Sequence, residues 1–153
     1  MDNETIIIEE LRKKNRTRRG YNFISDRRFE ELTSRARKEG AVILRGGEDV
    51  EAYLDIRHAD ALTIEKAILF RAQVTLSEVL EEVYHFEQNL KGLNSDKDAL
   101  LRGILNEIDA KKYLLDNVKT YRIPRKETED TIRQLKIYEQ MLVDWKEEHN
   151  VQG

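Results

Sequence analysis

The sequence predicts an α+β protein that is predominantly helical, with a small sheet and helices in its amino-terminal half followed by three long packed helices. Two observations lead to this prediction. Short β-branched and apolar runs occur up to Phe70, whereas apolar residues recur every three or four positions after Thr75. The 153 residues are 39% hydrophobic and 37% charged, which fits a helix-rich globular chain able to bury about two-thirds of the surface its unfolded form exposes.

The amino-terminal half is expected to alternate helices and strands. A helix begins at Ser25, a good capping residue, and ends at Gly40. A tight turn at Glu65 and Lys66 joins two short strands. The expected elements after the first helix are a buried strand, a short helix and these two strands, at residues 41–45, 48–56, 61–64 and 67–70.

Three long helices are expected next, at residues 76–91, 96–120 and 124–148. Thr75 or Ser77 can cap the first. Ser95 or Asp96 can cap the second, and Pro124 is favoured in the first turn of the third. Each helix has an apolar stripe that should face a core. The stripes are Leu76, Val79, Leu80, Val83, Phe86 and Leu90 in the first; Leu101, Leu105, Ile108 and Leu115 in the second; and Ile132, Leu135, Tyr138, Leu142 and Trp145 in the third.

Composition excludes several classes of site. The chain has no cysteine, which rules out disulfides, thiolate metal sites and cysteine nucleophiles. Its net charge of −3 gives no global reason to expect nucleic acid. No run approaches the ~18 apolar residues of a membrane span, and the first residues lack the apolar core of a signal peptide. We therefore expect no membrane partner and a cytoplasmic location.

The amino terminus is strongly basic. Residues 12–19, RKKNRTRR, hold six basic residues in eight. We expect residues 1–20 to form a flexible leader and residues 21–153 a single domain. The basic run is either simply solvated or an arm that contacts an acidic partner or nucleic acid. The sequence does not indicate an oligomeric state.

The first long helix carries a polar face opposite its apolar stripe. Glu78, Glu81, His85 and Gln88 gather there when the helix is wound at 100° per residue. Glu81 and His85 are one turn apart, so both can reach a single ion. Glu82 lies beside them, where a carboxylate could hold a water molecule. Two ligands flanking a general base are the roles found in an H-E-x-x-H helix, although an ordinary solvated face has the same composition.

The second long helix offers a third ligand. Glu107, in the segment NEIDA, lies off the apolar stripe and 22 residues after His85. Gly103 and Ala110 stand about one turn before and after it. These small residues would let another helix approach closely, which a shared ligand requires.

The order of these motifs resembles a known family. E-E-x-x-H followed by N-E-x-x-A is similar to the gluzincin pattern. The chain from about Arg18 to Leu142 resembles the small zincin-like metallopeptidase domains of bacterial polymorphic toxins and prophage-associated proteins. The segments ILFRAQVTLSEVLEE and KKYLLDNVKTYRIPRKETEDTIRQL contribute to this resemblance. It implies a minimal zincin-like fold, a divalent metal cofactor and a peptide or protein substrate. It also implies delivery as a toxin module as the alternative to a cytoplasmic location.

The resemblance implies a role for each candidate residue. Glu81, His85 and Glu107 would be metal ligands and Glu82 the general base of a metal-dependent hydrolase. Gln88 and Glu78 would support a ligand or contact substrate. Zinc is the expected ion, but Glu81 replaces the usual first histidine, which shifts preference toward harder ions such as manganese. Two alternatives stay open: an inactive zincin descendant, and a non-enzymatic helical module that binds through its basic arm.

Overall fold

The computed structural model describes residues 21–149. Of these, 65% are helical, and a three-stranded sheet accompanies six helices within the described residues. The predicted α+β, predominantly helical fold class is confirmed. The basic run at 12–19 lies outside the described residues. The chain divides after Lys91 into two compact units, which we describe separately.

The first unit matches the expected order of elements closely. Ser25 caps the first helix, because its Oγ accepts a hydrogen bond from the Arg28 amide at 3.1 Å. Glu65 adopts a left-handed φ of 55° in the turn between the last two strands. The elements are α2 (Asp26–Lys38), β1 (Val42–Arg45), α3 (Glu48–Ile56), β2 (Ala61–Ile64), β3 (Ala67–Phe70) and α4 (Leu76–Lys91).

The strand order of the sheet is β1-β3-β2, with β1 parallel and β2 antiparallel to the central β3. One expectation is wrong here, because β1 is not a buried strand. Val42 and Leu44 are 55% and 45% exposed. The strand lies at the sheet edge, and its alternate side chains fall on a face that is only partly covered.

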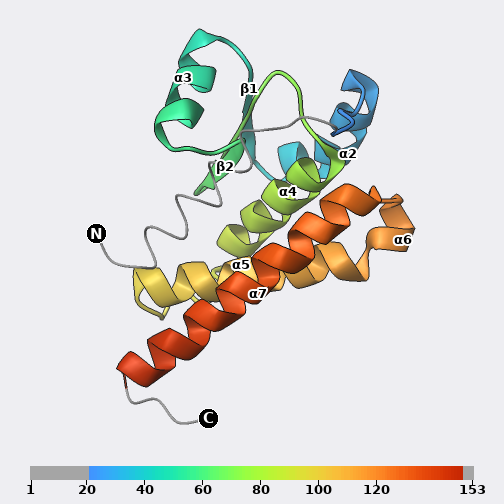
Figure 1. The fold of residues 1–153 in the computed structure, drawn as a ribbon. Coiled ribbons are helices and arrows are strands. Elements are labelled where there is room, and N and C mark those ends of the chain that lie inside the picture. Colours follow the sequence, from blue (N-terminus) through green and yellow to red (C-terminus); the bar gives the residue numbers. More distant parts are fainter. Residues whose placement is uncertain (1–20, 150–153) are drawn as a thin grey trace. The chain divides into compact units, whose positions relative to one another are not determined.

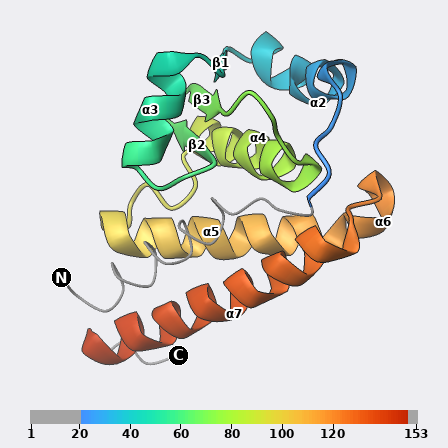
Figure 2. The same ribbon diagram turned by 45° about the horizontal axis from the view of Figure 1, so that its top comes forward.

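Helices lie on both faces of this sheet, as Figure 2 shows for α3 and α4. Ile68 and Phe70 of β3 pack with Phe29, Val79 and Phe86 in one buried cluster, which joins the sheet to α2 and α4. Leu69, between them, points the other way because side chains alternate along a strand. It packs with Leu54 of α3 and with Ala59 in a second buried cluster.

Helix α4 buries its predicted stripe but also one polar residue. Leu76, Val79, Leu80 and Phe86 are buried as expected, whereas Leu90, at the end of the helix, is 46% exposed. Gln88 retains only 2% of its accessible surface, although the pattern places it on the polar face. The interpretation of that face as simply solvated is therefore wrong at Gln88, and a buried amide needs hydrogen-bond partners.

Arg71 ties the end of β3 to α3. Its guanidinium lies 3.4 Å from Glu51, 2.8 Å from Asp55 and 3.1 Å from Asp60. Burial by itself lowers the pKa of Arg71, but the hydrogen bond to Asp55 and the surrounding carboxylates outweigh it, so the pKa is raised. These carboxylates already share a cation and form a structural ion-pair network.

The second unit contains α5 (Ala99–Asp116), α6 (Val118–Tyr121) and α7 (Arg125–Glu148). In Figures 1 and 2, α5 and α7 lie side by side. Pro124 is the N-cap of α7, so the helix starts one residue after the predicted position and Pro124 is not in its first turn. Within the described residues, no helix is both long enough and apolar enough to cross a membrane.

The expected helix at 96–120 is wrong at both ends. Asp98 caps α5, accepting a hydrogen bond from the Leu101 amide at 3.0 Å, so neither Ser95 nor Asp96 is the cap. The helix stops at Asn117, whose side-chain amide donates to the Tyr113 carbonyl oxygen at 2.8 Å. A side chain that bonds the last carbonyls competes with continuation of the helix. The short α6 follows as a separate element.

The apolar stripes of α5 and α7 are also shifted. Ile104, Ile108 and Leu114 are the most buried large apolar residues of α5. The expected Leu101, Leu105 and Leu115 are only half-buried. In α7, Met141 is buried whereas Ile132 is 40% exposed. Polar side chains are also buried on these helices, so the apolar pattern alone does not identify the buried face correctly. The buried polar residues are Asn106, Lys111, Glu127 and Thr131.

Candidate metal centre

The helix that carries the motif has a well-defined start. Glu78 Oε1 accepts a hydrogen bond from the Thr75 amide at 2.8 Å, and Thr75 Oγ1 accepts one from the Glu78 amide at 3.3 Å. This reciprocal pair is a capping box. It fixes the first turn of α4 and engages an oxygen of Glu78 in helix capping, so Glu78 has a local structural task in addition to any role at the site.

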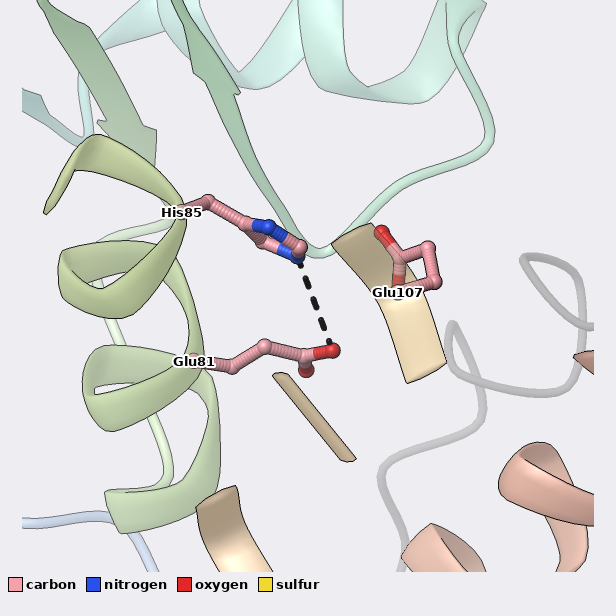
Figure 3. Close-up of side chains that lie close together, drawn as sticks. All are labelled: Glu81, His85 and Glu107. Atoms are coloured by element: carbon pink, nitrogen blue, oxygen red, sulfur yellow. Dashed lines mark ion pairs between the residues drawn. The ribbon is translucent and has the colours of Figure 1, made fainter. Parts of the chain in front are cut away.

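About two turns after Glu78, Gln88 orients His85. The His85 Nδ1 atom lies 2.7 Å from Gln88 Oε1. An amide oxygen only accepts hydrogen bonds, so Nδ1 carries a proton, and in the neutral ring Nε2 then keeps a lone pair. That Nε2 lies 3.9 Å from Glu81 Oε1, the contact drawn as a dashed line in Figure 3. Both side chains are mostly buried, with 14% and 17% of their surface exposed.

Thr63 contacts the next residue of the motif. Its Oγ1 lies 2.9 Å from Glu82 Oε2 and 3.0 Å from the Glu82 carbonyl oxygen. The sequence analysis does not identify Thr63 as a site residue. A signal exists in the strand ALTI, where one polar residue alternates with apolar neighbours. Its relevance depends on strand pairing, which a single sequence does not specify.

In the second unit, Glu107 of α5 pairs with a buried lysine. Glu107 Oε2 lies 3.3 Å from Lys111 Nζ, and the Lys111 side chain is 6% exposed. The ammonium also lies 5.9 Å from the centre of the Tyr138 ring, within reach of a cation–π contact. Sequence reasoning missed Lys111, although its spacing of four residues after Glu107 was a usable signal.

The predicted purpose of Gly103 is not supported. A Cβ built at this exposed position meets no heavy atom of the described residues within 4 Å. The glycine therefore permits no close approach there. Ala110, the other small residue near Glu107, is fully buried.

Glu81, His85 and Glu107 form a group that could hold a metal ion. Each offers one ligand atom, and these atoms lie within 4.8 Å of one another; Figure 3 shows the three side chains. Ligands about 2.0–2.2 Å from zinc are at most about 4 Å apart. The Glu81–His85 separation of 3.9 Å meets this limit.

No protein-family model, curated protein or solved structure matches this chain. The candidate metal centre therefore rests on the chemistry and positions of its own residues. Its donor set is one imidazole nitrogen and two carboxylates, which suits zinc and also harder divalent ions.

Proposed function

We propose that this protein is a metal-dependent hydrolase that cleaves peptide bonds. The observation that carries the proposal is the group of Glu81, His85 and Glu107, whose ligand atoms lie within 4.8 Å of one another. Glu82 follows Glu81 directly on α4. In metal sites that activate water, some residues bind the ion and a neighbouring carboxylate, which does not bind it, acts as the base. In this proposal, Glu81 has the first role and Glu82 the second.

The ligand atoms suit a divalent cation. Gln88 leaves the His85 Nε2 lone pair directed toward Glu81, which is the tautomer that coordinates metals through Nε2. Glu81 and Glu107 supply two carboxylates, and the charge of Glu107 is shared with Lys111, whose Nζ lies 3.3 Å from Glu107 Oε2. Zinc is the proposed ion, with manganese as the alternative that two oxygen donors favour.

In this proposal, Glu82 is the general base. A divalent ion, when bound, would lower the pKa of a water molecule and polarise the peptide carbonyl. Glu82 accepts a proton from the water as its oxygen bonds to the carbonyl carbon. Glu82 then returns that proton to the amide nitrogen as the carbon–nitrogen bond breaks. A carboxylate that is not a ligand can perform both transfers without releasing the ion.

The test separates binding from catalysis with two substitutions. Untagged protein should contain about one zinc or manganese ion per chain and hydrolyse members of a broad peptide library. Glu82→Gln should keep the ion but lower the rate by about 10²–10⁴-fold, the usual cost of losing a general base. His85→Ala should lose both the ion and activity. Glu87→Gln, on the same helix, is the control and should behave like the wild type.

Three results would contradict parts of this proposal. Metal binding by His85→Ala at wild-type affinity would show that the ligand assignment is wrong. Equal rates for Glu82→Gln and wild type would remove Glu82 as the base. Stoichiometric metal without hydrolysis of any library member would identify a metal-binding protein that is not a peptidase.

A further inference from the structure

The hydroxyl of Thr63 joins the sheet to α4 at the residue proposed as the general base. It lies 2.9 Å from Glu82 Oε2 and 3.0 Å from the Glu82 carbonyl oxygen. Both oxygens are acceptors, so the hydroxyl is the donor in either contact and shares its one hydrogen between them. An ionised carboxylate makes the stronger hydrogen bond of the two. Thr63 therefore holds one oxygen of the Glu82 carboxylate.

Strand pairing determines the direction of this hydroxyl. Thr63 of β2 is directly paired with Ile68 of β3, and directly opposed residues place their side chains on the same face. Ile68 is fully buried in the cluster that contains Val79 and Phe86 of α4. The same face therefore directs Thr63 toward this helix. A β-branched side chain is also stiff about χ1, so the donor is held by a rigid element.

We propose that Thr63 is a positioning residue, which holds the Glu82 carboxylate in the orientation that proton transfer requires. The catalytic part of this inference rests on the proposed function. With Oε2 engaged by Thr63, Oε1 is the oxygen that accepts the proton from water. The base must come within about 2.6–3.2 Å of the proton donor, and a carboxylate free to rotate would occupy that position less often.

The test compares two substitutions at Thr63. Thr63→Val removes the hydroxyl but keeps the branched shape, whereas Thr63→Ser keeps the hydroxyl. Thr63→Val should lower kcat by about 10- to 100-fold, as when a partner that orients a site residue is lost. KM and the Kd for zinc should stay within about twofold of wild type. Thr63→Ser should restore kcat to within about threefold.

A double-mutant cycle with Glu82→Ala shows whether Thr63 acts through Glu82. In that background, Thr63→Val should change the residual rate by less than about twofold, because the group it positions is gone. A residue that only supports the fold would lower the rate by the same factor in both backgrounds. That result, or failure of Thr63→Ser to restore activity, would overturn the catalytic part of the proposal.

Urea unfolding of the wild type, Thr63→Val, Glu82→Ala and the double variant separates this proposal from the hydrolase proposal. A Thr63–Glu82 hydrogen bond predicts that the double variant loses less stability than the sum of the single variants. Coupled stabilities without any hydrolysis would overturn the hydrolase proposal but support the assignment of Thr63 as the residue that positions Glu82. Additive stabilities would overturn that assignment, whether or not the wild type hydrolyses peptides.

Discussion

At the scale of single residues, one buried amide determines which nitrogen of His85 can bind a cation. Gln88 is 2% exposed and its oxygen lies 2.7 Å from His85 Nδ1. A partner at the far nitrogen fixes both the tautomer and the ring orientation of a histidine ligand. In the proposed site, the buried amide would thus leave Nε2 of the neutral His85 ring as the coordinating nitrogen.

Replacing Gln88 should therefore weaken metal binding without removing a ligand. Gln88→Leu should raise the Kd for zinc by about 10- to 100-fold, the usual cost of losing the partner of a ligand. Gln88→Glu keeps an acceptor of the same length and should stay within a few-fold of wild type. Competition with a chromophoric chelator measures both values.

The nitrogen chemical shifts of His85 give an independent check. In metal-free wild type, NMR should show Nδ1 protonated and Nε2 unprotonated. An Nε2-protonated ring, or wild-type zinc affinity in Gln88→Leu, would show that Gln88 does not orient the ligand.

At the scale of elements, side-chain caps decide where the helices begin. The capping box of Thr75 and Glu78 starts α4, and Asp98 starts α5. A helix has four unpaired amides at its amino end, and a cap satisfies some of them. Each cap thus fixes the first turn of a helix that carries proposed ligands further along, since α4 contains Glu81 and α5 contains Glu107.

The cap of α5 can be tested against the residue that the sequence suggested. Asp98→Ala should lower the free energy of unfolding by about 1 kcal/mol, because the Leu101 amide loses its acceptor. Asp96→Ala is the matched control, since its side chain is 77% exposed; it should change stability by less than about 0.5 kcal/mol. Urea denaturation measures both, and a larger loss for Asp96→Ala would contradict the observed cap.

At the scale of the whole molecule, the proposed metal binding would be linked to the stability of the folded chain. Glu81 and His85 belong to the unit that ends at Lys91, and Glu107 belongs to the unit that begins at Gly92. A ligand that binds only the folded state stabilises it by mass action. An ion held by the proposed ligands would therefore raise the free energy of unfolding.

Zinc should therefore stabilise the wild type in a way that depends on Glu107. At free zinc about 100-fold above the Kd, the expected gain is about 2.7 kcal/mol, measured by urea unfolding with and without zinc. Glu107→Gln should lose most of this gain. The control is Asp109→Asn, an exposed acidic residue on the same helix, which should retain it. An unchanged gain in Glu107→Gln would show that Glu107 is not a ligand.

Most of the fold was accessible from the sequence because it depends on local rules. Ser25 and Thr75 are caps whose chemistry acts within one helical turn. Short β-branched and apolar runs located the strands, periodicity located α4, and helical spacing placed Glu81 and His85 one turn apart. These features follow from backbone geometry and from neighbours fewer than five residues away.

The tertiary structure alone decided the features that depend on distant partners. Thr63 acquires a role only because strand pairing turns it toward Glu82, 19 residues away. Gln88 is buried although its position in the helical pattern is polar. Val42 is exposed because β1 lies at the sheet edge. Burial and long-range hydrogen bonds depend on how elements pack, and no local pattern in one sequence specifies that packing.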